Sequence, residues 1–174
     1  NPQAHLAALA LGVLCTASEA APTLSGQGVD GLRIGALAAH IAGDRITATQ
    51  ERVNGETGLP VTALGVRLGQ GIAMVEIDQG RIRRMAISHP GPTTASGVQV
   101  GTRAARAAQR DDAVAEIGPG GWLILIPRKR CGLAYRTNLE LDTQQLQADW
   151  NTAKLRQLAS TVVIKEIVVF GCKP

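Results

Sequence analysis

The chain alternates hydrophobic and polar residues over several short stretches, and this two-residue period is typical of half-buried β-strands. The stretch "GIAMVEIDQGRIRRMAISHP" (71–90) contains two such runs around Asp78-Gln79-Gly80, whose residue types tolerate left-handed backbone conformations. It therefore predicts a β-hairpin. Further strands are predicted at 45–53, at 60–68, in "GWLILIPRKRCGLAYRT" (121–137) with a break near residues 130–132, and in "TVVIKEIVVFGC" (161–172).

Helical spacing occurs in "DTQQLQADWNTAKLRQLAS" (142–160). Leu146, Trp150, Ala153 or Lys154, and Leu158 recur at intervals of three or four residues, which places them on one side of a helix. The segment therefore predicts an amphipathic helix.

One short phrase occurs twice. Residues 31–35 read "GLRIG" and residues 97–101 read "GVQVG", an offset of 66 residues (97 minus 31), and each copy is followed by an Ala-rich segment. The second glycine of each copy would allow a sharp turn into a helix. Thr102 is expected to cap the second helix through its hydroxyl, whereas Ala36 at the equivalent position carries no such group.

Together these elements predict an α+β domain, with a mainly antiparallel sheet and two or three short helices arranged as two duplicated helix-plus-strands units. The alternative is that the phrase is a chance match of five positions. Because 174 residues fit one domain, residues 21–174 are assigned to a single α+β domain.

The first twenty residues have the pattern of a secretory signal peptide. The apolar run 6–14 is followed by small residues, with Ser18 and Ala20 suited to the cleavage position. The run is too short to span a bilayer, so no transmembrane anchor is expected. A periplasmic or secreted address follows, and the alternative is an amphipathic or buried N-terminal helix.

Cys15 raises the question of lipid attachment at the end of this apolar run. Bacterial lipoprotein signals carry Ala or Gly before the modified cysteine, whereas Leu14 stands there in this chain. The pattern therefore favours a secreted form without a lipid anchor.

Removal of residues 1–20 would leave Cys131 and Cys172 as an even pair. In an oxidising compartment this pair predicts a disulfide, which would stabilise the fold by roughly 4 kcal/mol at most. The alternative is two unrelated buried thiols. No metal site is expected, because His40 and His89 are not at ligand spacing from a cysteine.

Charge and composition narrow the partners. The formal net charge is +4, and the candidate cationic face consists of Arg81, Arg83, Arg128 and Lys129; further basic residues include the cluster 103/106/110. Such a face would attract an anionic polymer, or its residues are solvated strand and helix faces. Aromatic residues make up only 2% of the chain, so nucleic acid is not an expected partner, because single-stranded binding uses aromatic stacking.

Catalytic motifs give little support for an enzyme, and no catalytic residues are assigned. His89, next to Ser88, is the better candidate base of the mature chain, and a hydrolase would pair it with a nearby Ser or carboxylate. Asp111-Asp112 with Glu116 would suit a cation or acid–base chemistry, or form the polar end of a helix. "GPGG" (118–121) completes neither a phosphate loop nor a dinucleotide loop, so no cofactor is expected.

Several segments in order carry a resemblance to a known family: the signal-like start, "GVDGL" (28–32), "VEIDQGRIRRMAI" (75–87), "TTASGVQVGT" (93–102) and "IKEIVVFGC" (164–172). In this outline the chain resembles small uncharacterised bacterial cell-envelope lipoproteins over roughly residues 24–174. The resemblance implies an envelope address and no catalysis, and Leu14 before Cys15 departs from the family's lipid-attachment pattern.

These inferences lead to one functional expectation with two alternatives. We expect a non-enzymatic, secreted or periplasmic envelope protein that binds an unknown protein or envelope component through a sheet face or through the loop "SHPGPTTASG" (88–97). The first alternative is a small periplasmic hydrolase that uses His89. The second is a binder of an anionic polymer through the Arg/Lys face.

Overall fold

A computed structural model of the chain describes residues 21–53 and 58–172. The predicted signal peptide at residues 1–20 therefore lies outside the described residues. Within the described part, no helix has both the length and the apolar character needed to cross a membrane. The elements are β1 (Thr23–Ser25), β2 (Gly28–Val29), β3 (Leu32–Arg33), β4 (Ile46–Val53), β5 (Pro60–Leu68), β6 (Gly71–Asp78), β7 (Arg81–Ile87), β8 (Thr93–Thr94), α1 (Ala104–Asp111), β9 (Ala113–Ile117), β10 (Trp122–Pro127), β11 (Leu133–Glu140), α2 (Thr143–Leu146), α3 (Thr152–Arg156) and β12 (Ile164–Val169).

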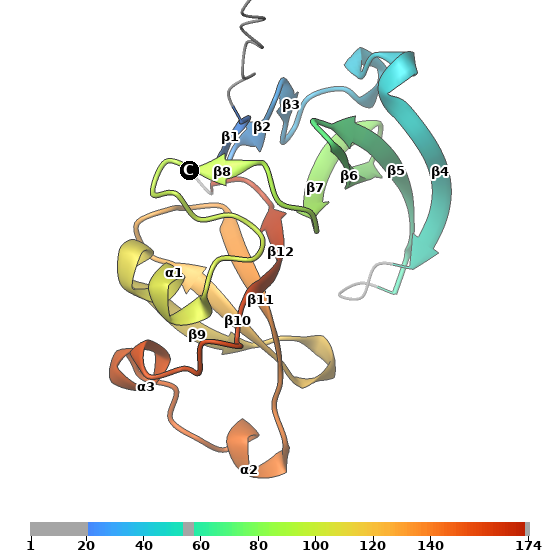
Figure 1. The fold of residues 1–174 in the computed structure, drawn as a ribbon. Coiled ribbons are helices and arrows are strands. Elements are labelled where there is room, and N and C mark those ends of the chain that lie inside the picture. The colour runs from blue at the N-terminus through green and yellow to red at the C-terminus, as the bar shows by residue number, and fades with distance from the viewer. Residues whose placement is uncertain (1–20, 54–57, 173–174) are drawn as a thin grey trace, which may run out of the picture.

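The main sheet consists of two four-stranded meanders. Its strand order is β4-β5-β6-β7-β12-β11-β10-β9, and all neighbouring strands are antiparallel. The meanders β4–β7 and β9–β12 are joined by their last strands, β7 and β12, as Figure 1 shows. A small sheet of order β3-β2-β1-β8 lies beside them.

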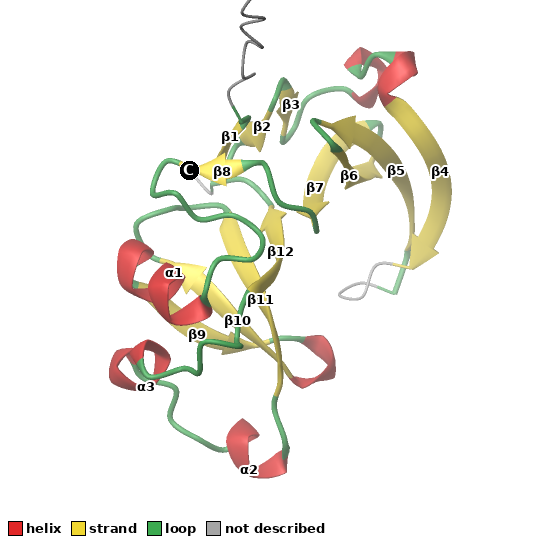
Figure 2. Cartoon of the chain, viewed as in Figure 1, coloured by secondary structure: helices red, strands yellow, loops and turns green. Residues whose placement is uncertain are grey.

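The prediction of an α+β domain is wrong, because strands dominate the described residues and the three α-helices are only eight, four and five residues long (Figure 2). The Ala-rich segment after the first phrase forms only two 3-10 turns, Ala38–His40 and Gly43–Arg45. Its second turn begins at Gly43, and glycine disfavours a helix interior. A helix-plus-strands unit is therefore absent from the first half.

The prediction of a single helix over residues 142–160 is also wrong, because two N-cap residues start two separate short helices there. The Asp142 side chain accepts a hydrogen bond from the Gln145 amide and starts α2, and Asn151 caps α3 in the same way. The Trp150 indole donates to the Gln145 carbonyl at 2.9 Å and closes the connection between the two helices.

The two phrases have the same backbone conformation even though the segments that follow them differ. Gly31 and Gly97 have φ of 78° and 77°, and Gly35 and Gly101 have φ of 83° and 90°, values that favour glycine. Each phrase forms three backbone hydrogen bonds with the start of the last strand of its meander and the residues just before it. In the first copy, at β7, the bonds run from the Gly35 amide to Ile82, from the Ile82 amide to Ala36 and from the Ala38 amide to Gly80. In the second copy, at β12, they run from the Gly101 amide to Ile164, from the Ile164 amide to Thr102 and from the Ala104 amide to Val162.

Thr102 does not cap α1, contrary to the prediction. The N-cap residue is Arg103, which makes no side-chain cap, and the Thr102 hydroxyl instead accepts a hydrogen bond from the Gln99 amide at 3.0 Å. The hydroxyl thus stabilises the turn within the phrase.

One hydrophobic core joins both meanders to the small sheet and to the helices. Its members alternate along the strands, so that residues such as Met85, Ile87 and Ile167 face inward. Over the second meander, α1 presents Ala104, Ala107 and Ala108 to the core, and α3 contributes Leu155, which is fully buried. Small alanine side chains let α1 approach the sheet closely.

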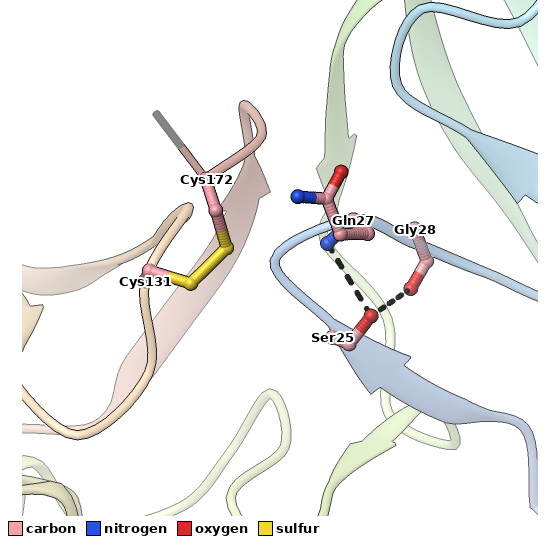
Figure 3. The surroundings of a disulfide bond; sticks show 5 residues. All are labelled: Ser25, Gln27, Gly28, Cys131 and Cys172. Carbon is pink, nitrogen blue, oxygen red and sulfur yellow. Dashed lines mark hydrogen bonds between the residues drawn. A yellow bond between two sulfur atoms is a disulfide. The ribbon is translucent and has the colours of Figure 1, made fainter. Parts of the chain in front are cut away.

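The predicted disulfide between Cys131 and Cys172 is confirmed, with Cα atoms 5.0 Å apart. It ties the β10–β11 connection to the segment after β12, and the β1–β2 turn with Gln27 lies beside it (Figure 3). Gly26 is required in that turn, because a Cβ there would overlap the Cys131 carbonyl. The bond thus closes the β10–β11 connection of the second meander onto the segment after β12.

Candidate functional site

The outer face of the main sheet, opposite the core, carries the second set of alternating residues. Ala86 of β7 is directly opposite Val168 of β12, which is opposite Ala134 of β11. A neighbouring row runs through Glu166 and Arg136 and continues into β10 and β9. The face therefore presents aliphatic and charged side chains in adjacent rows.

These side chains enclose a groove of about 770 Å³, which we call the outer groove. It spans six strands, and the residues that line it are Glu76, Arg83, Arg84, Glu116, Pro119, Trp122, Ile124, Ile126, Ala134, Arg136, Glu166, Val168 and Phe170. Its volume lies in the range of ligand-binding clefts.

Large apolar side chains form much of the groove. Trp122, Ile124 and Ile126 come from β10, and Val168 and Phe170 come from the end of the chain. Phe170 is 43% exposed. The whole chain has only two Trp, one Tyr and one Phe, so half of its aromatic side chains lie in this groove.

The charged side chains of the groove are organised by one another. Arg136 Nε lies 3.3 Å from Glu166 Oε1, and its guanidinium lies 5.5 Å from the centre of the Trp122 ring. The Ser88 hydroxyl donates to the other Glu166 oxygen at 3.1 Å. Arg84 and Glu76 form a second, longer pair at 3.9 Å. These contacts hold Trp122 and Arg136 in place before any ligand binds.

A groove of this composition is suited to binding rather than to covalent chemistry. Aromatic, aliphatic and arginine side chains are the residue types enriched where protein interfaces bind most strongly. Charges of both signs line the walls, which favours a partner with mixed charge. Among the described residues, no cluster of three or more metal-ligating side chains is found.

Among the described residues, the hydrogen bond found for His89 is to a backbone carbonyl, not to the hydroxyl or carboxylate that the hydrolase alternative requires. Its ring packs on Gly71, and its Nε2 donates to the Leu68 carbonyl at 3.1 Å. Nδ1 is buried without a partner in the described part of the chain. Ser88 points instead to Glu166. His89 is therefore half-buried, not an exposed strand end.

The loop 88–97 is less free than its composition predicts. Thr93 and Thr94 form β8, which pairs with β1 in parallel, and Thr94 is 3% exposed. Its hydroxyl accepts from the Val98 amide and contacts the Ser96 hydroxyl. This segment thus contributes to the small sheet, and part of the predicted binding loop is buried.

The four predicted cationic residues have separate surroundings. The Arg81 guanidinium donates to the Gly35 carbonyl at 2.8 Å, Arg83 lies 4.0 Å from Asp78 in addition to lining the outer groove, and Arg128 forms an ion pair with Asp112 at 3.0 Å. Lys129 is exposed. Three of the four thus already have protein partners.

The predicted acidic group of Asp111, Asp112 and Glu116 is dispersed. Asp111 is fully buried and accepts a hydrogen bond from the Tyr135 hydroxyl at 2.7 Å, while Asp112 pairs with Arg128 and Glu116 lines the outer groove. Burial, followed by the hydrogen bond to Asp111 and its charge, raises the pKa of Tyr135 far above its usual value. This pair stabilises the core and is closed to a ligand.

Trp122, Phe170, Arg136 and Glu166 were not predicted as functional residues from the sequence. A signal for them was present, because "WLILI" (122–126) and "IVVF" (167–170) are continuous apolar runs without alternation. Such runs indicate strands with apolar side chains on both faces. In a sheet covered on one side only, the second apolar face marks a surface available to a partner.

Comparison with known proteins supports the fold alone. No protein-family model and no curated protein matches the chain. Among solved structures, the chain is similar to the uncharacterized protein YfeY from Escherichia coli, with 14% identity and a TM-score of 0.60 over 85% of this chain and 99% of that one. The two proteins therefore share an architecture, and the likeness assigns no activity to this chain.

Proposed function

We propose that this chain is a non-catalytic cell-envelope protein that binds a segment of another protein in the outer groove. The observation that carries the proposal is that Trp122 and Phe170 both line one groove of a chain with few aromatic residues. Fully desolvated aromatic and arginine side chains supply most of the binding energy at protein interfaces.

The arrangement of charges supports a protein segment as the partner. The groove pairs Arg136 with Glu166 and Arg84 with Glu76, so neither sign dominates. A partner with alternating apolar and polar groups would satisfy both the aliphatic row and the charged row, as an extended peptide does. The occupant is therefore expected to cross the strands with its apolar side chains on Ala134 and Val168.

Two features support an envelope address. The Cys131–Cys172 disulfide is typical of oxidising compartments, and residues 1–20 have a signal-like pattern. The test is the intact mass of the protein from its native host with and without reduction. Loss of residues 1–20 with thiols that react only after reduction supports the address, and a full-length mass with free thiols overturns it.

The binding proposal is tested by photo-crosslinking in the native host. A benzoylphenylalanine at position 170 preserves an aromatic side chain at the groove, and the same residue at position 37 is the matched control, because Phe170 and Leu37 are 43% and 40% exposed. We expect one discrete protein adduct from position 170 and none from position 37.

A second substitution connects the adduct to the groove. Trp122→Ala removes the aromatic side chain and its contact with Arg136, so it is expected to reduce the yield from position 170 without changing the amount of protein. Equal adducts from positions 170 and 37, or no adduct from position 170, would refute the proposal.

A further inference from the structure

A second groove, distinct from the outer groove, is lined by arginines. It has a volume of about 740 Å³ and lies between the second phrase, α1 and the segment from Arg156 to Ser160. Its cationic residues are Arg103, Arg106, Arg110 and Arg156, and its lining contains no Asp or Glu. We call it the arginine groove.

The packing of α1 explains how the arginines come together. Ala104, Ala107 and Ala108 face the core, so Arg103, Arg106 and Arg110, spaced by three and four residues, share the opposite side. The helix α3 packs against α1 and ends at Arg156. Two helices distant in sequence thus contribute to one cationic surface.

The exposed arginines of this groove differ from six arginines elsewhere in the chain. Six other arginines lie within 4.0 Å of a carboxylate: Arg45, Arg83, Arg84, Arg128, Arg130 and Arg136. Within the described part of the chain, Arg103, Arg106 and Arg156 have no carboxylate partner, and all three are exposed. Their guanidinium groups remain available to an external anion.

Arg110 has a different part in the groove. It is half-buried and donates to the Ser96 and Gly97 carbonyls at 3.1 Å, so it holds the second phrase against α1. It thereby fixes one wall of the arginine groove.

The placement of these cations is locally unfavourable. Arg103 is the N-cap of α1 and Arg106 lies in its first turn, where no acidic residue is present, although the positive end of a helix favours anions. Like charges at helical spacing also repel. A bound anion would remove both costs, which indicates that the arginines serve a ligand rather than the helix.

We propose that the arginine groove binds a ligand that carries two or more phosphate groups. The guanidinium fork matches phosphate oxygens and can bind them in a bidentate manner. The groove is larger than a single phosphate needs, and its cations are spread over two helices. Both a free oligophosphate and a phosphorylated lipid headgroup present this chemistry.

The test is calorimetric titration of the full chain with tripolyphosphate, together with sedimentation on vesicles rich in cardiolipin, whose headgroup carries two phosphates, and on phosphatidylcholine vesicles. The variant Arg103→Gln/Arg106→Gln/Arg156→Gln changes three exposed positions. The control Arg33→Gln/Arg52→Gln/Lys129→Gln removes the same charge from exposed positions outside the groove. Single Arg106→Gln and Arg156→Gln variants serve if the triple variant melts early.

We expect tripolyphosphate to bind the native chain with an affinity that falls as salt rises, and to bind the groove variant about tenfold or more weakly, a loss of about 1.4 kcal/mol or more. The control is expected to retain its affinity. Vesicle binding with the same dependence on the groove arginines identifies a lipid headgroup, and binding of tripolyphosphate alone identifies a free oligophosphate. Absence of both, or equal losses in groove variant and control, overturns the proposal.

Discussion

The two meanders share a topology but differ in what covers them. Both are preceded by the same glycine phrase and both end in a strand at the centre of the sheet. The second is covered by α1 and α3, whereas the first has only 3-10 turns, and its edge strand β4 is exposed from residue 47 to residue 53 (Figure 1).

The functional features follow this difference. The disulfide, the arginine groove and most of the apolar lining of the outer groove belong to the second meander and its helices. The first meander contributes chiefly the charged residues Glu76, Arg83 and Arg84. The two meanders thus share a topology, but most of the candidate binding surfaces belong to the second.

Removal of the disulfide is expected to give the largest difference in stability between the two meanders. Cys131→Ala/Cys172→Ala opens a link between residues 41 positions apart and is expected to lower the free energy of unfolding by up to about 4 kcal/mol. Urea denaturation measures the loss, and hydrogen exchange is expected to rise more in β10 and β11 than in β5 and β6. A uniform rise in both meanders would contradict the comparison.

The next largest loss of stability is expected where α3 packs on the second meander. Leu155→Ala is expected to lower the free energy of unfolding by about 3 kcal/mol, since it leaves a cavity beneath α3. Val53→Ala on β4, where the side chain is 72% exposed, is expected to change it by less than about 0.5 kcal/mol. Thermal denaturation of the two variants measures the contrast, and similar losses would mean that β4 is covered in solution.

The buried Tyr135–Asp111 pair predicts a pH dependence. The raised pKa of Tyr135 keeps its hydroxyl protonated in the folded state. The contribution of Tyr135 to the free energy of unfolding is therefore fully present below about pH 10. Above that pH the contribution falls by up to about 1.4 kcal/mol per pH unit. Tyr135→Phe removes this slope and, at neutral pH, costs about 1–3 kcal/mol.

Tyr135 is the single tyrosine of the chain, so tyrosinate absorbance reports on it directly. We expect the tyrosinate absorbance to appear at the same pH at which circular dichroism shows that the chain unfolds. Ionisation near pH 10 in a chain that remains folded would disprove the assignment.

The repeated phrase predicts the smallest and most symmetric effect. Gly35→Ala and Gly101→Ala each place a Cβ in a left-handed conformation, which costs about 1–2 kcal/mol. Because the two glycines make equivalent backbone hydrogen bonds, equal shifts in melting temperature are expected. A cost confined to one position would show that the two copies are not equivalent.

Local patterns predicted the strands better than the helices. The hairpin around Asp78-Gln79-Gly80 follows from alternation and turn chemistry, and the structure contains it as β6 and β7. The helix predicted over 142–160 failed because periodicity does not detect the N-caps at Asp142 and Asn151.

The grooves depend on pairings that a single sequence does not contain. Trp122 and Phe170 line one groove only because β11 lies between β10 and β12. Arg156 joins Arg103 and Arg106 only because α3 packs against α1. The sequence shows these aromatic and arginine residues, but only the fold determines which of them lie in the same groove.

In the proposed function, a partner covers the outer groove in the envelope. Oxidative footprinting of intact native cells and of the purified chain tests it directly, because Trp122 lies in the groove and Trp150 lies outside it as an internal control. We predict that Trp122 and Phe170 are oxidised in the purified chain and protected in cells, while Trp150 is oxidised equally in both. Equal oxidation of Trp122 in cells and in the purified chain would contradict the account.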